Sequence, residues 1–225
     1  MAQELAHPQS LAFAQHCAAL LHQRRREPPA VQAYADGVLT LATAQRFPLY
    51  VGWGACWRGW ALTMQGQGEA GLAQLRQGMT ALLSTGQRVS QPLCLVLLAE
   101  AVEHVGQVEE GLCLLAETLT AFEASRRNDM LTEAYRLQGE FLLRQAIPNA
   151  TQAETCFQQA LDIARRQQAK SWELRVATSL ARLWQRQRKR AEAHALLVPI
   201  YGWFTEGFDT ADLQEARALL VELQQ

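Results

Sequence analysis

The residues of this chain that could do chemistry are its five histidines and five cysteines. A metal site needs three or more converging ligands. Glu100 and His104 are one helical turn apart and Glu103 stands beside them, whereas His16 and His22 are six residues apart and fall on different helix faces. A solvated helix face is therefore the favoured interpretation of Glu100 and His104, and we predict no metal.

The cysteines and glycines give no catalytic arrangement either. No cysteine has a histidine or an acid in a recognised local pattern, and neither CxxC nor GxSxG occurs. The glycines of WGACWRGW (53–60) superficially resemble a phosphate loop. They lack a preceding strand and a following lysine, so close helix packing is favoured. We predict a non-enzymatic protein without cofactor, with reduced cysteines and a cytoplasmic location.

Composition narrows the class of protein further. Among 225 residues the hydrophobic fraction is 49% and the net charge is −1, and Ala, Leu, Gln and Arg dominate while isoleucine occurs only at 147, 163 and 200. This favours helix over sheet. The basic clusters Arg24–Arg26, Arg165–Arg166 and Arg186–Arg190 lie near expected helix ends, where cations complement the helix dipole. We therefore predict neither a nucleic acid nor a membrane as partner.

The chain repeats itself about every 40 residues. Small residues mark the second helix of each unit, with spacings of 38, 40, 42 and 40, at Ala33, Gly71, Gly111, Ala153 and Ala193. A second set of small residues marks the preceding helix, at Ala19, Gly59, Ala99, Gly139 and Ala181. Small side chains at these places allow paired helices to approach closely.

The helical periodicity and the short turns predict antiparallel helix pairs. We expect an all-α, right-handed superhelical solenoid in a single domain over 1–225, with a C-terminal capping helix. The expected pairs are 9–26 with 29–44, 48–65 with 68–84, 90–105 with 108–125, 129–146 with 150–168, and 171–187 with 190–204, and the cap is 210–223. Trp203, Phe204 and Phe208 are expected in the core under the cap; if exposed, they would indicate self-association.

The fourth unit resembles the tetratricopeptide repeat (TPR). That pattern has an aromatic residue and Leu-Gly in the first helix and Ala, Phe, Ala in the second, matched here by Tyr135, Gly139, Ala153, Phe157 and Ala160. The period is near 40 rather than 34, and the closing proline of the pattern is missing.

A wider resemblance covers segments 7–27, 59–78 and 175–220. These look like the C-terminal TPR array of large bacterial signalling proteins that join a nucleotide cyclase or regulator output domain to an AAA (STAND-type) ATPase. The resemblance implies a sensor or scaffold array, with catalysis elsewhere, and the chain has no GxxxxGK[ST] phosphate loop.

In TPR proteins the first helix of each pair lines a concave groove. The resemblance implies a protein or peptide partner that binds this groove, which changes from aromatic to acidic to basic along the chain. A small-molecule pocket near Trp53 and Trp60 is the alternative. The candidate groove residues are Phe13, His16, Trp53, Cys56, Trp60, Glu100, Glu103, Glu133, Arg136, Glu140, Arg175 and Arg182.

Overall fold

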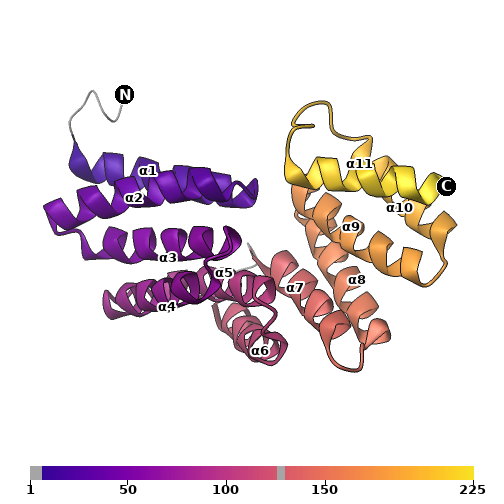
Figure 1. The fold of residues 1–225 in the computed structure, drawn as a ribbon, viewed down its shortest axis with the longest axis horizontal. Coiled ribbons are helices and arrows are strands. Elements are labelled where there is room, and N and C mark those ends of the chain that lie inside the picture. Colours follow the sequence, from indigo (N-terminus) through magenta and orange to yellow (C-terminus); the bar gives the residue numbers. More distant parts are fainter. Residues whose placement is uncertain (1–6, 126–129) are drawn as a thin grey trace. The chain divides into compact units, whose positions relative to one another are not determined.

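The structure, a computed structural model, describes residues 7–125 and 130–225. These residues form eleven α-helices and one short 3₁₀-helix, with no strand among them (Figure 1). The helices are α1 (Pro8–Arg24), α2 (Pro28–Gln45), α3 (Pro48–Met64), α4 (Gly68–Ser84), α5 (Gln91–His104), α6 (Val108–Ser125), α7 (Leu131–Arg144), α8 (Ala150–Arg166), α9 (Lys170–Arg186), α10 (Arg190–Tyr201) and α11 (Ala211–Gln224).

The helices match the expected segments closely, and the all-α repeat class is confirmed. The expected start of α7 at residue 129 lies outside the described residues. The chain separates into two compact units, Met1–Glu110 and Gly111–Gln225, which we treat one at a time. The single domain over 1–225 stays a prediction.

Left-handed residues stand just after seven of the described helices, 20 residues apart within each of two runs. Positive φ angles occur at Arg26, Arg46, Gly66, Gly86 and Gly106, and again at Gln168 and Arg188. Each stands just after a helix, where a left-handed residue lets the last carbonyls find partners. Glycine accepts this conformation without steric cost, whereas arginine and glutamine pay about 1 kcal/mol. The 40-residue repeat is thus two helix-and-turn segments of equal length.

The structure corrects one marker of the repeat. Gly71, Gly111, Ala153 and Ala193 are each the fourth residue of their helices, and the fourth residue of α2 is Val31. Val31 is fully buried, whereas Ala33 is exposed. The choice of Ala33 was wrong because the first repeat has valine at the position where the other repeats have a small residue. The spacings become 40, 40, 42 and 40.

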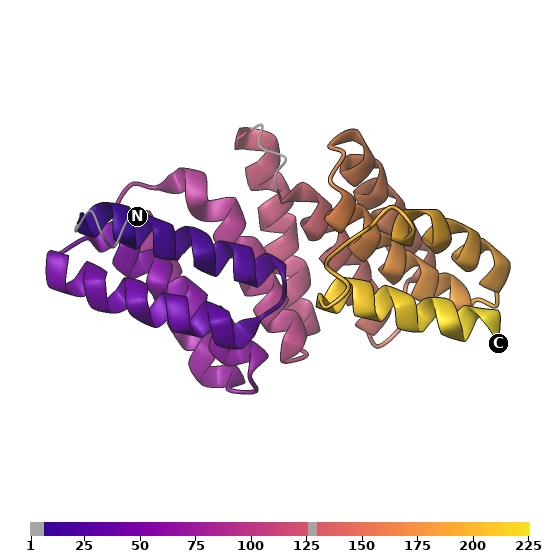
Figure 2. The same ribbon diagram turned by 90° about the horizontal axis from the view of Figure 1, so that it is seen from above.

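In unit 1, helices pair in antiparallel fashion, as α1 and α2 do in Figure 2. The closest approach is between α3 and α4. A Cβ atom on Gly59 would lie 2.5 Å from the Leu75 backbone nitrogen and 2.7 Å from the Gly71 carbonyl oxygen. The backbones therefore touch at the small residues, as the sequence predicts.

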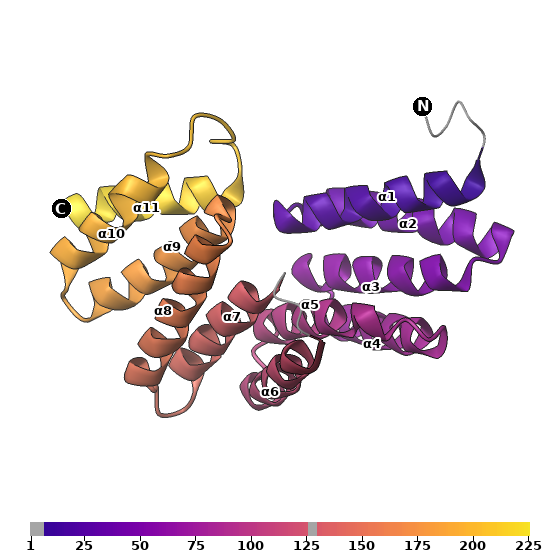
Figure 3. The same cartoon turned by 180° about the vertical axis from the view of Figure 1, so that it is seen from behind.

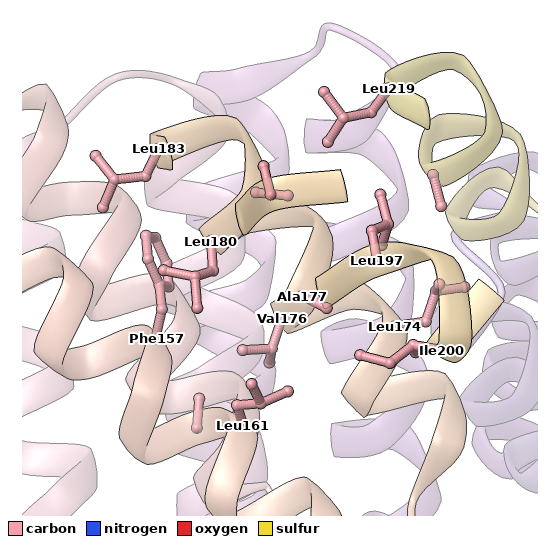
Figure 4. Close-up of a cluster of buried hydrophobic side chains, with 14 of the residues drawn as sticks. Phe157, Leu161, Leu174, Val176, Ala177, Leu180, Leu183, Leu197, Ile200 and Leu219 are labelled. Atoms are coloured by element: carbon pink, nitrogen blue, oxygen red, sulfur yellow. The ribbon is translucent and has the colours of Figure 1, made fainter. Parts of the chain in front are cut away.

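In unit 2, α7 to α11 enclose a second core (Figures 3 and 4). Phe157 fills the space beside Gly139, because a Cβ there would lie 2.5 Å from its ring. The cap α11 closes the core with four buried residues, Leu213, Ala216, Leu219 and Leu223.

The expectation for the C-terminal aromatic residues was only partly right. Phe204 packs against the core, but Trp203 and Phe208 are 58% and 47% exposed. Because α11 itself supplies the aliphatic residues that cover the core, these two rings are left at its surface.

Candidate functional site

The candidate groove residues lie on first helices of the pairs: α1, α3 and α5 in unit 1, and α7 and α9 in unit 2. In unit 1, Trp53, Cys56 and Trp60 are buried, whereas Phe13 is 57% exposed. His16 and Glu103 are half-buried. The tryptophans are thus part of the packing between helices in the described structure, and their role in binding a partner stays a prediction.

The aromatic residues of unit 1 pack on one another. Trp53 and Trp57 stack at 5.4 Å between ring centroids, and His16 lies 4.7 Å from Trp53. The Trp57 Nε1–H group donates to His16 Nδ1 at 3.1 Å. Trp57 was not among the candidate residues, although its position one turn after Trp53 places it on the same helix face.

His16 is a half-buried neutral acceptor, and we expect this to make unit 1 sensitive to acid. Burial lowers the pKa of His16 from 6.5 to about 4. Protonation would also place a proton on Nδ1, which faces the Trp57 donor. Because the unfolded chain binds this proton more readily, stability falls as the pH drops below about 6.5 and continues to fall until about 4.

We expect the wild-type chain to lose about 2 kcal/mol of unfolding free energy from this group between pH 7 and 4.5. His16→Asn keeps an acceptor oxygen near Nδ1 but cannot titrate, so its urea midpoint should vary less over that range. Equal pH slopes for the two proteins, measured by circular dichroism, would contradict the assignment.

Glu100 joins three first helices of unit 1. Its Oε2 atom accepts from Gln23 Nε2 at 2.8 Å and from Trp60 Nε1 at 2.7 Å. Glu100 is only 8% exposed and Gln23 only 1% exposed. The carboxylate therefore positions α1, α3 and α5 relative to one another, a role that the sequence pattern did not indicate.

Cys56 is a poor candidate for a nucleophile. Its contact with the Cys94 thiol and its burial raise the pKa of the Cys56 thiol, and the sulfur lies 3.9 Å from the Leu75 carbonyl oxygen. A thiol with a raised pKa forms little thiolate and is a poor nucleophile. None of the five cysteines, which all lie in the described residues, forms a disulfide bond.

The candidate residues of unit 2 gather into one ion network. Arg136 on α7 donates to both carboxylate oxygens of Glu133, at 2.9 and 2.7 Å. Arg175 on α9 lies 3.8 Å from Glu133 and donates to both oxygens of Asp212 on α11, the shortest bond being 2.7 Å. We call Glu133, Arg136, Arg175 and Asp212 the central network.

The central network is shielded from water. The exposed fraction is 1% for the Glu133 side chain, 11% for Arg175 and 14% for both Arg136 and Asp212. Burial alone would raise the pKa of Glu133, but the positive charges of Arg136 and Arg175 hold it below its ordinary value. Burial opposes the charge of Arg175, yet Glu133 and Asp212 raise its pKa. Both groups are therefore charged at neutral pH.

Further polar pairs surround the central network, and some of them are more exposed. Arg182 Nη2 lies 3.1 Å from Glu215 Oε2, with side chains 44% and 34% exposed. Ser179 donates to Glu140 at 2.6 Å, and Gln185 donates to Glu222 at 3.1 Å. We call the first-helix face of unit 2 that carries these groups, on α7, α9 and α11, the charged face.

Asp212 and Glu215 were missed as members of this face. The segment 210–223 was expected only as a capping helix, so none of its residues was considered for the groove. α11 contacts both α9 and α10, as the first helix of a sixth repeat would. Aligning the cap with the other first helices would have been the signal.

The described part of the chain contains no group of three or more histidine, cysteine or acidic side chains that could hold a metal ion. None of its helices is long and apolar enough to cross a membrane.

These helix pairs and their packing define a TPR-like helical-repeat solenoid. One similar solved structure contains the nearly identical TPR-like repeats of a kinesin light chain from Podosopora anserina. It is 18% identical, with a TM-score of 0.57, and the match covers 98% of this chain and 99% of that one. A second structure of that protein, with one substitution, is 19% identical with a TM-score of 0.58, covering 97% and 98%. No protein-family model and no curated protein matches the sequence.

Proposed function

We propose that the chain is a non-catalytic protein-interaction module, and that the charged face of unit 2 binds a segment of the partner protein. The observation that carries this proposal is the gathering of charged side chains of both signs from three helices on that face. TPR-like solenoids offer such first-helix faces to peptides and helices.

The two layers of the charged face have different physical roles. The central network is buried and doubly hydrogen-bonded, so it holds α7, α9 and α11 in a fixed arrangement. The Arg182–Glu215 pair is exposed, and such pairs contribute little to stability because water screens them. A partner carboxylate can replace Glu215 beside Arg182 at small cost.

A partner segment of mixed charge is the best complement to this face. Its acidic group would contact Arg182, and its basic group would contact Glu215 or Glu222, which are both on α11. Opposite charges arranged in this order give specificity and direction more than affinity.

In unit 1, an interaction role is favoured over the small-molecule pocket. The rings of Trp53, Trp57 and His16 pack against one another, so they are engaged in the core. Phe13 is the exposed aromatic candidate that unit 1 contributes to a partner surface.

The wider resemblance of segments 7–27, 59–78 and 175–220 supports a more specific proposal. The chain would act as the sensor or regulatory array of a bacterial AAA-type ATPase or nucleotide cyclase in the cytoplasm. Adding purified chain to such an enzyme from the same genome should change its nucleotide turnover. An unchanged rate at saturating chain would contradict this part of the proposal.

The charged face is tested by one charge reversal and a matched control. Arg182→Glu should weaken capture of the partner by about tenfold, which is ~1.4 kcal/mol, because it repels the partner carboxylate. Arg166→Glu makes the same change at an exposed position on α8, a second helix, and should leave capture unchanged.

Binding is measured by titrating the partner, identified by crosslinking to the full chain, against each variant at two salt concentrations. Helical content by circular dichroism confirms that both variants fold. Equal affinities for Arg182→Glu and wild type would overturn the assignment of the charged face.

A further inference from the structure

The outer side of α1 carries an exposed apolar row. Ala14 and Cys17 are exposed, and Leu21 is 59% exposed. The three residues are spaced three and four apart, so they lie on one face of the helix. An exposed leucine alone would need no explanation, but this row has counterparts in the first helix of each later helix pair.

The repeat spacing identifies those counterparts. The small residues that mark the first helices are spaced 40 residues apart from α1 through α7 and 42 residues apart from α7 to α9, at Ala19, Gly59, Ala99, Gly139 and Ala181. The counterparts of Ala14 are Gly54, Cys94, Ala134 and Val176; those of Cys17 are Trp57, Leu97, Leu137 and Ser179; those of Leu21 are Ala61, Ala101, Phe141 and Leu183. All twelve are buried, so only α1 exposes this face.

The structure shows what covers this face in the later helix pairs. A Cβ on Gly54 would lie 2.8 Å from Leu39 Cγ and 3.3 Å from the Ala35 carbonyl oxygen, both on α2. In unit 2, Phe141 lies against Gly111 on α6. The covering element is thus the second helix of the preceding pair, which presents small and aliphatic residues.

The opposite end of the chain does not offer such a surface. α11 places Gln214 and the charged Arg217 among the exposed Ala218 and Val221 on its outer side, so that side is not an uncharged row. An end-to-end stack of two copies would therefore bury the Arg217 charge against the apolar row, which is costly.

From these contacts we infer that the Ala14–Cys17–Leu21 face of α1 is a docking surface for a second helix of a further helix pair. The docking helix carries an uncharged row of small and aliphatic residues like the one α2 presents to α3. This surface is separate from the charged face of unit 2, and either assignment can fail without the other.

The chain itself supplies the probe. A copy of residues 8–47 inserted between His7 and Pro8 adds one pair in the natural 40-residue register, with Cys17→Ser in the added copy only. We expect the labelling rate of the original Cys17 by a maleimide, followed by peptide mass spectrometry, to fall at least about tenfold relative to the uninserted chain. Exposed Cys113 serves as the internal reference.

A matched insertion with Leu39→Glu in the added copy places a carboxylate in the docking row, because Leu39 is the α2 side chain that contacts Gly54 on α3. It should leave Cys17 as reactive as in the original chain, while circular dichroism reports whether the added pair is helical. An added pair that is helical but leaves Cys17 unprotected overturns the proposal, and so does one that fails to become helical.

The uninserted chain provides the last arm of the experiment. Its Cys17 should stay reactive at every protein concentration. If Cys17 becomes protected as concentration rises and light scattering shows a dimer, the occupant is a second copy, and the inferred helix pair is wrong.

Discussion

Gly59→Ala is expected to lower the free energy of unfolding by about 3 kcal/mol. The added Cβ would meet the backbone of α4 at three atoms, including the Leu75 nitrogen at 2.5 Å and the Gly71 oxygen at 2.7 Å. Backbone atoms cannot rotate away as a side chain can, so α3 and α4 must separate. Separation opens gaps beside Trp60 and Leu75, which are buried.

The matched control is Gly37→Ala. There the added Cβ would meet only the end of the Gln15 side chain, at 3.0 Å from Nε2. That side chain can move, and alanine favours helix over glycine by up to about 1 kcal/mol. Gly37→Ala should therefore be neutral or stabilising. Urea unfolding followed by circular dichroism compares the variants, and equal effects would contradict the close approach of α3 and α4.

The fold was predictable because local patterns determine most of it. Small residues recur where helices touch, and turn residues recur where helices end, so both the helix bounds and the repeat class follow from the sequence. The one wrong marker, Ala33, arose where valine replaces the small residue. Nothing local distinguishes Val31 from an ordinary core residue.

The candidate site was predictable only in part, because burial and pairing are properties of the whole packing. Glu133, Arg136 and Arg175 were expected on the groove side of their helices, and the structure brings the three side chains together. The sequence did not indicate that Glu133 is buried or that Asp212, 37 residues after Arg175, is bound to it. Trp60 was expected in a groove, yet its indole donates to Glu100 in the core.

Arg175→Met is expected to lower the free energy of unfolding by about 3–5 kcal/mol at pH 7. Methionine keeps an unbranched apolar stem but removes the charge that Glu133 and Asp212 share. Asp212 loses its bonds from Arg175, and Glu133 retains only the charge of Arg136 on α7. α11 is therefore held less tightly, and thermal unfolding of unit 2 should begin at lower temperature.

Measurements at acidic pH distinguish the loss of the Arg175 charge from a simple loss of packing. In the wild type the lowered pKa of Glu133 means that its contribution is present above the unfolded value near 4.5 and is lost as the pH falls through the lower folded value. In Arg175→Met that contribution is already small. The stability difference should be largest at neutral pH and shrink below about pH 4.5, as Glu133 becomes neutral.

Arg182→Met is the matched control for Arg175→Met, because it removes an arginine from the same helix whose partner pair is exposed. Its cost should stay below about 1 kcal/mol. Asp212→Asn in the Arg175→Met background should recover part of the loss, since it removes a part-buried charge that no longer has Arg175 beside it. The central network would be disproved as the anchor of α11 if Arg175→Met and Arg182→Met cost the same, or if the deficit of Arg175→Met were unchanged at pH 4.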